Sequence, residues 1–585
     1  MIKIFGFNKN KNEAKLHFKG KHFRDILEII KSDSSIVYDK KNIEWKVPIQ
    51  SIQSMIDSLC EIKGEKITID KDIYEAVNDS EKRKKELLKI KNRLKNVEFK
   101  VKTYNDMELY PFQKVGAAFL YLKRRALLAD VVGLGKTVQA LAAVEKRFEK
   151  NTMQNCIIVC PKSLIKKWQK DIKKFFGRDA MIIGSGKRAR MQSYSKFEKC
   201  KHNYLIMNYE PLRMDEKYLT YMFNEAMGGR PISGIIFDEI QYLKNYTAKR
   251  SIAARNIANL SAMKVMYGLS ATYIETGLEN LFGVFLVLDR SVFGDNFYRF
   301  QNHYLELDYW GRITGYKNVE DVAEKINIYT IRRHKEQVIA QLPKVNYINY
   351  NVDLTAQQYS LIDDIKERIL DEINDSNKRQ SVVYANAMTQ LGLMNQACLS
   401  AELFEAGNHS GKMDEVLNIM EGMDSESKIV IFCHYQKMVE IICRELMESK
   451  YGAVFMHGKS EYGKTLEGRY QMIDYWGKTK ECRVLVTSDI LAEGVDLVEA
   501  NYLINFDLLW NPAKMAQRNG RIDRISQKAS QITIINLIST NTVEEKIFER
   551  LEERKELASI VMDGGFESQR ISNITLNDIR KFFNK

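Results

Sequence analysis

The segment that most constrains the fold is L-L-A-D-V-V-G-L-G-K-T at residues 127–137. The apolar residues 126–129 lead into a glycine-containing turn, and the residues after the turn show helical periodicity. In a strand, loop and helix of this order, the N–H groups of the loop and the helix N-terminus surround a phosphate. The pattern predicts that Lys136 reaches the β- and γ-phosphates of a nucleotide and that the Thr137 hydroxyl holds Mg²⁺.

One position departs from the strict phosphate-loop pattern, which has glycine where this chain has Asp130. On its own, the segment therefore also fits a glycine-rich turn before a core helix. Further motifs follow along the chain in the order that a nucleotide-binding enzyme needs, and they favour the first interpretation.

The length of 585 residues exceeds what one hydrophobic core organises, so the sequence predicts three or more structural units. Hydrophobic residues make up 45% of the chain and charged residues 28%, which is typical of soluble globular proteins. The net charge of +14 suits a polyanionic partner such as nucleic acid, although many basic proteins bind none. Eight cysteines without a C-x-x-C pair favour neither a zinc site nor a disulfide framework. With no long apolar run and no signal peptide at the N-terminus, we expect a cytoplasmic protein without a membrane segment.

Gln113 ends the phrase L-Y-P-F-Q at residues 109–113, shortly before the phosphate loop. A glutamine side chain can form two hydrogen bonds with the amide-like edge of adenine, and neighbouring aromatic rings can stack on the base. At this place in the sequence, the phrase predicts the adenine contact.

The stretches at residues 156–160 and 204–210 show the same pattern, which predicts a buried strand that ends in a polar turn. The polar turn P-K-S at 161–163 follows the first of them. This turn suits a nucleic-acid phosphate, and an ordinary α/β loop fits it equally well.

Asp238 and Glu239 end the apolar stretch I-I-F-D-E at residues 235–239. Because α/β sheets bind ligands at the carboxyl ends of their strands, we expect both carboxylates to face the nucleotide. Asp238 would hold Mg²⁺, and Glu239 would orient and deprotonate the attacking water. A capping pair at a strand end is the alternative.

The phrase S-A-T at 270–272 follows another short strand and would relay between the phosphate site and a nucleic-acid track.

A second α/β series follows, with strands expected at 428–432, 451–458 and 483–489, and it continues to the phrase Y-L-I-N-F-D at 502–507. Its last element reads Q-R-N-G-R-I-D-R-I-S-Q at residues 517–527. Arg521 and Arg524 are three residues apart on a predicted helical stretch and would share one face. Two guanidinium groups on one face suit a triphosphate whose charge shifts during transfer, and a basic surface helix is the alternative.

Together these segments resemble the Swi/Snf-type branch of the superfamily 2 helicase-like ATPases over roughly residues 104–560. The most specific matches are D-x-x-G-L-G-K-T at 130–137, D-E at 238–239 and the phrase that runs from W-N-P to the final S-Q at 510–527. The family has aspartate in place of the first phosphate-loop glycine, which accounts for Asp130. The resemblance implies two RecA-like lobes that track along double-stranded DNA.

The resemblance also implies a role for each residue that matches a family motif. The implied nucleotide-binding residues are Gln113 for adenine, Asp130, Gly133, Leu134, Gly135, Lys136 and Thr137 in the phosphate loop, and Gln517 in the second lobe. The implied Mg²⁺ ligands are Thr137 and Asp238. The implied catalytic residues are Lys136, Asp238, Glu239 and the two arginine fingers Arg521 and Arg524. ATP and Mg²⁺ are the implied cofactors, and duplex or branched DNA, bound without regard to sequence, is the implied partner.

Three phrases depart from the family pattern. The phosphate loop has V-V at 131–132 where the family usually has Glu-Met, and Gln241 replaces the histidine of the D-E-x-H box. The phrase S-A-T at 270–272 replaces the usual G-T-P. The last two changes bring the chain closer to general superfamily 2 helicases, but none of the three removes a residue that performs the chemistry.

The predicted fold class is α/β, with two tandem RecA-like lobes, helical insertions and a small N-terminal α+β accessory domain. The expected boundaries are 1–103 for the accessory domain, 104–290 for the first lobe, 291–410 for the insertions and inter-lobe bridge, 411–560 for the second lobe, and 561–585 for a C-terminal brace. In the accessory domain we expect strands at 2–7 and 13–18, a helix at 23–30 and a hairpin at 36–47. The phrase E-W-K-V-P at 44–48, with the amphipathic stretch 49–59, resembles the HepA-related module of annealing helicases.

We therefore expect an ATP-dependent translocase or remodeller of double-stranded or branched DNA, in which hydrolysis between two lobes drives movement along the DNA backbone. A strand-separating superfamily 2 helicase that acts on RNA or on DNA containing single strands is the first alternative. A catalytically inactive nucleic-acid-binding scaffold is the second.

Overall fold

The computed structural model describes the chain in the following segments. They are residues 2–8, 13–18, 22–32, 36–39, 44–60, 67–75, the single positions 85, 89, 92 and 94, then 98–199, 202–223, 232–260, 263–274, 277–309, 311, 313–338, 344–374, 380–408, 410–492, 495–524, 527, 529, 531–549 and 551–552. The brace predicted at 561–585 lies outside the described residues. Within the described segments, no helix has both the length and the apolar character that crossing a membrane requires.

The N-terminal part of the chain contains a five-stranded sheet in the order β3-β4-β2-β1-β5. Its elements are β1 (Ile2–Asn8), β2 (Glu13–Phe18), α1 (Phe23–Ser32), β3 (Val37–Asp39), β4 (Glu44–Pro48), α2 (Ile49–Cys60) and β5 (Ile67–Ile69). The predicted strands, helix and hairpin are confirmed, whereas the parallel pairing of β5 with β1 was not foreseen. Apolar residues that alternate along β2, such as Ala14 and Leu16, pack with Ile26 of α1 and Ile52 of α2 into a separate core.

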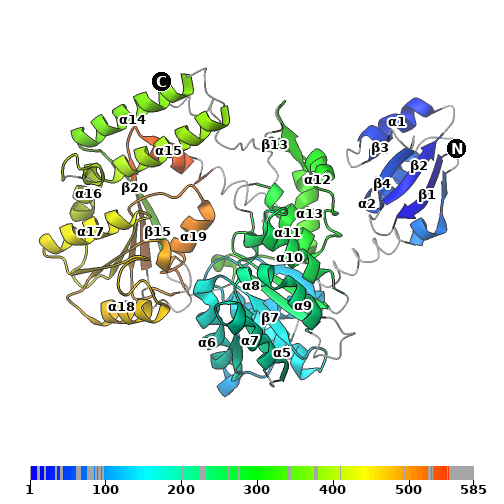
Figure 1. Ribbon diagram of the computed structural model, residues 1–585, viewed down its shortest axis with the longest axis horizontal. Coiled ribbons are helices and arrows are strands. Elements are labelled where there is room, and N and C mark those ends of the chain that lie inside the picture. Colours follow the sequence, from blue (N-terminus) through cyan, green and yellow to red (C-terminus); the bar gives the residue numbers. More distant parts are fainter. Residues whose placement is uncertain are drawn as a thin grey trace. The chain divides into compact units, whose positions relative to one another are not determined.

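Two parallel sheets follow, each in its own compact unit of the chain (Figure 1). The first has seven strands in the order β14-β6-β11-β10-β7-β9-β8. They are β6 (Arg125–Leu128), β7 (Cys156–Val159), β8 (Ala180–Ile182), β9 (Tyr204–Met207), β10 (Gly234–Asp238), β11 (Val265–Leu269) and β14 (Thr330–Ile331). Strands β7, β9, β10 and β11 are buried along their whole length, which is why the sequence shows them as continuous apolar runs.

Helices cover both faces of this first sheet. On one face α4 (Pro111–Lys123), α5 (Lys136–Glu149) and α6 (Ile165–Phe176) share a core with alternate strand residues such as Ile158 and Ile236. On the other face the side chains of Leu127 of β6 and Leu288 of α11 (Glu279–Leu288) both lie beside Gly268 of β11. The further helices of this unit are α7 (Lys187–Lys199), α8 (Tyr209–Met214), α9 (Glu216–Phe223) and α10 (Lys249–Ala258).

The second parallel sheet has six strands in the order β15-β20-β19-β16-β18-β17. They are β15 (Lys344–Val352), β16 (Ile429–Phe432), β17 (Ala453–Met456), β18 (Val484–Thr487), β19 (Tyr502–Asn505) and β20 (Gln531–Ser539). Ile431 of β16 packs in one core with α16 (Gly411–Glu421) and α17 (Gln436–Glu448), and its neighbour Val430 packs in another core with Trp476 of α18 (Leu466–Lys478). The three strands predicted for this sheet, at 428–432, 451–458 and 483–489, are confirmed as β16, β17 and β18.

The range 291–410, in which we expected insertions and a bridge, supplies an edge strand to each sheet. Strand β14 pairs with β6, and β15 pairs with β20 over all of its nine residues. Neither strand was predicted. The other elements of this range are α12 (Phe297–Tyr304), β12 (Leu305–Leu307), β13 (Ile313–Tyr316), α13 (Val319–Tyr329), α14 (Ala356–Asn374) and α15 (Gln380–Leu399).

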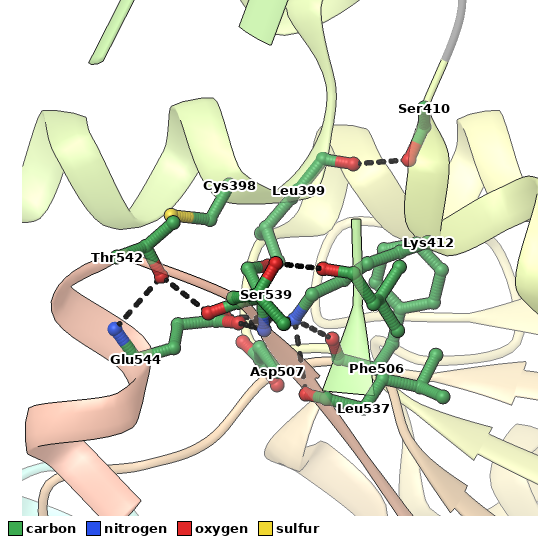
Figure 2. Close-up of polar contacts among 12 residues, drawn as sticks. Cys398, Leu399, Ser410, Lys412, Phe506, Asp507, Leu537, Ser539, Thr542 and Glu544 are labelled. Carbon is green, nitrogen blue, oxygen red and sulfur yellow. Dashed lines mark hydrogen bonds and ion pairs between the residues drawn. The ribbon is translucent and has the colours of Figure 1, made fainter. Parts of the chain in front are cut away.

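A buried ion pair joins four segments around the second sheet (Figure 2). The side chains of Lys412 and Glu544 are each 0% exposed, and Lys412 Nζ lies 2.7 Å from Glu544 Oε2. The same ammonium group donates to the carbonyl oxygens of Phe506 at 2.7 Å and Leu537 at 3.2 Å. The Ser539 N–H donates to Glu544 Oε2 at 2.9 Å. Because a buried charge is tolerated only when it is paired and hydrogen-bonded, these contacts fasten α16, the ends of β19 and β20, and the helical turn around Glu544 to one another.

Candidate nucleotide-binding site

The carboxyl ends of the central strands of the first sheet carry the predicted motifs. Leu128 of β6 pairs with Leu269 of β11, and Leu269 pairs with Asp238 of β10. The Ser270 N–H donates to the Leu128 carbonyl at 3.2 Å, so the chain after β11 starts beside the phosphate loop. The strand register therefore brings the phosphate loop, the D-E pair and the S-A-T phrase to one edge of the sheet, where α/β proteins bind ligands.

The phosphate loop depends on its two glycines and on Asp130. Gly133 has φ +96° and Gly135 has φ +72°, values that strain any residue with a side chain. Lys136 is the first residue of α5, and its Nζ lies 2.8 Å from the carbonyl oxygen of Asp130. The buried Asp130 carboxylate accepts a hydrogen bond from Gln139 Nε2 at 3.0 Å. Asp130 thus braces the loop against α5, which gives a structural reason for aspartate at a position where the strict pattern has glycine.

The other predicted nucleotide-binding residues around the phosphate loop are Gln113 on α4, Leu134 in the loop itself and Thr137 in the first turn of α5. Gln113 is buried in the first turn of α4, and its Oε1 accepts a hydrogen bond from the Tyr110 N–H at 3.1 Å. The half-exposed Tyr110 ring stacks on Phe112, with 5.9 Å between ring centroids. Leu134 is fully buried, and Thr137 is partly exposed in the first turn of α5. Helices α4 and α5 pack against each other.

Asp238 and Glu239 lie at the end of β10, as predicted. Asp238 Oδ2 accepts a hydrogen bond from Trp168 Nε1 at 2.7 Å, and Asp238 Oδ1 accepts one from the Glu239 N–H at 3.1 Å. Burial and the neighbouring Glu239 carboxylate raise the pKa of Asp238, while the Trp168 N–H and the Lys136 ammonium act in the opposite direction. The Glu239 backbone is left-handed at φ +52°, and Gln241 Nε2 donates to its carboxylate at 2.7 Å. Lys136 and Glu239 therefore both lie close enough to Asp238 for their charges to affect its pKa.

The S-A-T phrase forms a tight turn after β11. The Thr272 N–H donates to Ser270 Oγ at 3.0 Å, and Arg332 Nη1 donates to the Ala271 carbonyl at 3.2 Å. Within the described residues, the buried Thr272 hydroxyl has no hydrogen-bond partner. The turn is therefore tied to the segment that follows β14.

The structure corrects the helix that we expected through residues 517–527. Helix α19 spans Pro512–Asn519, and Arg521 and Arg524 lie in turns beyond its end. The helix ends at its C-cap residue Gly520, a residue type with low helix propensity, and the Arg521 N–H then donates to the Arg518 carbonyl at 3.0 Å in a tighter turn. The two arginines therefore do not form a pair on one helix face.

Gln517, Arg521 and Arg524, the residues predicted to act from the second unit, are each held by defined contacts. Gln517 is buried on α19. Arg521 is also buried, with Nε donating to the Gln517 carbonyl at 3.0 Å and Nη1 to the Val495 carbonyl at 2.9 Å. Arg524 Nη1 lies 3.3 Å from Asp496 Oδ1. Backbone and carboxylate oxygens thus fix the direction of both guanidinium groups.

Sequence reasoning missed Arg518, which organises the same region. Its side chain is fully buried and bridges two carboxylates, with Nε 2.6 Å from Asp489 Oδ1 and Nη1 2.9 Å from Asp507 Oδ1. The His434 N–H donates to Asp507 Oδ2 at 2.8 Å, and the hydrogen bond between the His434 ring and Asp489 raises the pKa of His434. Arg518 lies directly after Gln517, but nothing local in the sequence distinguishes a buried arginine from a surface one.

A model of the SNF2-related domain matches residues 87–403, more than half of the chain. The chain belongs to the SNF2-related family. A second model, the helicase conserved C-terminal domain, matches residues 411–526. The seven-stranded and six-stranded parallel sheets are the two RecA-like lobes of this SNF2-related chain, lobe 1 and lobe 2, as predicted.

The SNF2-related chain is similar to several curated proteins. An uncharacterized ATP-dependent helicase of Mycoplasma genitalium is 25% identical over 75% of this chain and 40% of its own length. The putative ATP-dependent helicase/translocase YwqA of Bacillus subtilis is 25% identical over 77% of this chain and 48% of its own length. The DNA repair protein rhp54 of Schizosaccharomyces pombe is 25% identical over 81% of this chain and 61% of its own length. The chain therefore spans less than two thirds of the length of each of these relatives.

A solved structure of the Sulfolobus solfataricus SWI2/SNF2 ATPase core in complex with double-stranded DNA is also similar to this chain. The sequence identity is 23% and the TM-score is 0.38. The match covers 80% of this chain and 96% of that one.

Proposed function

We propose that this chain hydrolyses ATP and uses the energy to translocate along, or remodel, double-stranded or branched DNA. The observation that carries the proposal is the carboxyl edge of the lobe 1 sheet, where Lys136 lies beside the Asp238–Glu239 pair as an NTP hydrolase requires. Membership of the SNF2-related family supports it, as do relatives named as ATP-dependent helicases, a translocase and a DNA repair protein.

The residues at this edge fit a nucleotide with Mg²⁺. Gly133 and Gly135 have positive φ, and loops of such geometry present backbone N–H groups to phosphates. Thr137 and Asp238 supply hydroxyl and carboxylate oxygens, the ligand types that Mg²⁺ prefers. The raised pKa of Asp238, beside a second carboxylate, is what a divalent cation would offset. When bound at Thr137 and Asp238, Mg²⁺ would neutralise phosphate charge.

In the proposed mechanism, Glu239 orients and deprotonates the attacking water, and Gln241 holds the Glu239 carboxylate in place. Lys136 positions the β- and γ-phosphates, and Arg521 and Arg524 of lobe 2 stabilise the charge that develops during transfer. Lobe closure on ATP and opening after hydrolysis would move one lobe along the DNA backbone. Because the DNA contacts would be mainly to phosphates, sequence would not be read.

A strand-separating helicase that acts on RNA or single-strand-containing DNA is the second candidate. Gln241 and the S-A-T phrase at 270–272 favour it, because both depart from the Swi/Snf pattern toward general superfamily 2 helicases. Unwinding and fork-regression assays on matched substrates distinguish the two candidates. An inactive nucleic-acid-binding scaffold would release no phosphate with any substrate.

We also propose the domain division given by the sequence: an accessory domain at 1–103, lobe 1 at 104–290, insertions and bridge at 291–410, lobe 2 at 411–560 and a brace at 561–585. The separate hydrophobic core of the N-terminal sheet supports the first of these. The resemblance of its E-W-K-V-P phrase to the HepA-related module suggests that the accessory domain contacts DNA.

The proposal is tested by steady-state ATP hydrolysis of the purified chain, alone and with duplex DNA, forked DNA, single-stranded DNA or RNA. Stimulation by duplex or forked DNA is the expected result. Stimulation by RNA or single strands alone would support the second candidate. Absence of turnover with every nucleic acid would overturn both.

We expect Glu239→Gln to lower kcat for ATP by about 10²- to 10⁴-fold, the usual contribution of a general base, without loss of duplex DNA binding. Lys136→Ala is expected to abolish hydrolysis as well. Glu210→Gln, a change of the same type at a half-exposed position of lobe 1, should leave kcat unchanged. DNA-stimulated phosphate release and fluorescence anisotropy with labelled duplex are the measurements. Retained stimulated turnover in Glu239→Gln or Lys136→Ala would contradict the site assignment.

A further inference from the structure

Trp168 connects the exposed side of helix α6 with the carboxylate of Asp238 in lobe 1. It lies on α6, the helix that follows β7 and the P-K-S turn at 161–163. Its ring is 1% exposed, within the core that α6 shares with α4 and α5. The opposite side of the same helix is exposed and basic. Its exposed basic residues are Lys166, Lys170, Lys173 and Lys174.

The indole N–H of Trp168 points at the Asp238 carboxylate. The distance from Nε1 to Asp238 Oδ2 is 2.7 Å, which is short for an N–H donor and typical of a charged acceptor. The other oxygen, Oδ1, accepts the Glu239 N–H at 3.1 Å. The two donors together fix the rotation of the carboxylate. One of them belongs to the strand end and the other belongs to α6.

An indole is well suited to this position for two reasons. It donates one hydrogen bond, has no acceptor and carries no charge, so it orients a carboxylate without neutralising it. An arginine or lysine in its place would pair with Asp238 and compete with a metal cation. The ring is also too large and too well packed to move independently of its helix, so a displacement of α6 displaces the donor.

We propose that Trp168 is a positioning residue that couples helix α6 to the Asp238 carboxylate, so that DNA phosphates bound by the basic side of α6 set the orientation of that carboxylate. This inference rests on the proposed function, because it explains how duplex DNA would stimulate ATP hydrolysis. The lysines on one side of α6 supply the attraction to DNA, and the indole on the other side transmits the resulting shift to the site.

Trp168→Phe tests the inference, because it keeps the buried ring and removes the donor. We expect the DNA-stimulated kcat to fall at least tenfold and the ratio of stimulated to basal rate to fall with it. The KM for ATP, the Kd for duplex DNA and the midpoint of thermal unfolding should stay close to the wild-type values. The matched control is Trp476→Phe in lobe 2, which deletes a buried indole donor that binds the Arg483 carbonyl at 3.2 Å and should leave the stimulation ratio unchanged.

The outcomes separate this inference from the proposed function. Wild-type protein without DNA-stimulated hydrolysis would overturn the proposed function, and the coupling with it. A stimulated wild type with an equally stimulated Trp168→Phe variant would overturn the coupling alone. If the variant instead loses thermal stability and all kinetic parameters fall together, Trp168 has a structural role only, and the inference is wrong.

A measurement on the unaltered chain covers the case in which the variant does not fold. In protein labelled with ¹⁵N-tryptophan, each indole N–H gives one resonance, and Trp→Phe changes at the other positions assign the Trp168 signal by elimination. We expect duplex DNA, without nucleotide or Mg²⁺, to shift this signal while that of Trp476 stays in place. A Trp168 signal that DNA does not move would overturn the inference.

Discussion

Lys412→Met is expected to destabilise lobe 2 by about 3–5 kcal/mol, the range found when one partner of a buried ion pair is removed. The ammonium group lost in this variant donates to Glu544 and to two backbone carbonyl groups, at the ends of β19 and β20. Its removal leaves the Glu544 carboxyl group without its cationic partner at a position that is 0% exposed. Methionine fills a similar volume, so the loss reports the charge and the hydrogen bonds and not a cavity.

Hydrogen exchange in the full-length chain is the suitable measurement, because a protein with two lobes need not unfold in one step. Amide protection in β19 and β20 should drop by roughly 10²- to 10³-fold, since each 1.4 kcal/mol corresponds to a factor of ten in the opening equilibrium. Protection in β7 and β10 of lobe 1 should not change. The double variant Lys412→Met with Glu544→Gln removes both charges, and we expect it to recover part of the loss. If the single variant were as stable as the wild type, the pair would not fasten lobe 2.

Arg521→Ala is expected to lower the ATP turnover number by about 10³- to 10⁵-fold, the effect of removing an arginine finger. The physical reason is the negative charge that spreads over the γ-phosphoryl oxygens during transfer, which a fixed guanidinium group stabilises. The carbonyl groups of Gln517 and Val495 already hold the Arg521 side chain in one direction. Arg518, three residues earlier in the chain, has a structural role instead, because the carboxylates of Asp489 and Asp507 bind its guanidinium group.

Stopped-flow or steady-state phosphate release, with ATP affinity measured separately by equilibrium binding, checks this expectation. Nucleotide affinity should change much less than turnover, because the finger acts mainly in the transition state. The matched control is Arg444→Ala on α17, a half-exposed arginine of lobe 2 that pairs with Glu402. That variant should keep its turnover within twofold. An Arg521→Ala variant with full turnover would exclude Arg521 as a finger.

The elements that carry the site could be predicted because their signals are local. The apolar run, the two glycines and the helical period at 126–144 predicted β6, the phosphate loop and α5. The run that ends in Asp238 and Glu239 likewise predicted β10. In both cases the pattern lies within one element, and burial on both sides of a parallel strand keeps the run apolar.

The contacts that hold these elements in place could not be predicted, because they join residues far apart in the chain. Trp168 binds a carboxylate 70 positions away, and Lys412 binds one 132 positions away. The burial of Glu544 could not be predicted either, since a buried glutamate and a surface glutamate look alike in sequence. The end of α19 was placed too late for a different reason: the local stop signal, the C-cap residue Gly520, lies inside the motif predicted to be one helical stretch.

The way in which the chain passes from one sheet to the other has a mechanical consequence. Residues 332–343 join the end of β14 to the start of β15, so tension in this connection is applied to one edge strand of each sheet. Strand β15 is paired with β20 at nine positions, which share a force along the strand, whereas β14 is paired with β6 at two positions. Under load, β14 would therefore yield first. The Ala129 N–H donates to the Ile331 carbonyl at 2.8 Å, so a force on β14 would act directly on the end of β6, which leads into the phosphate loop.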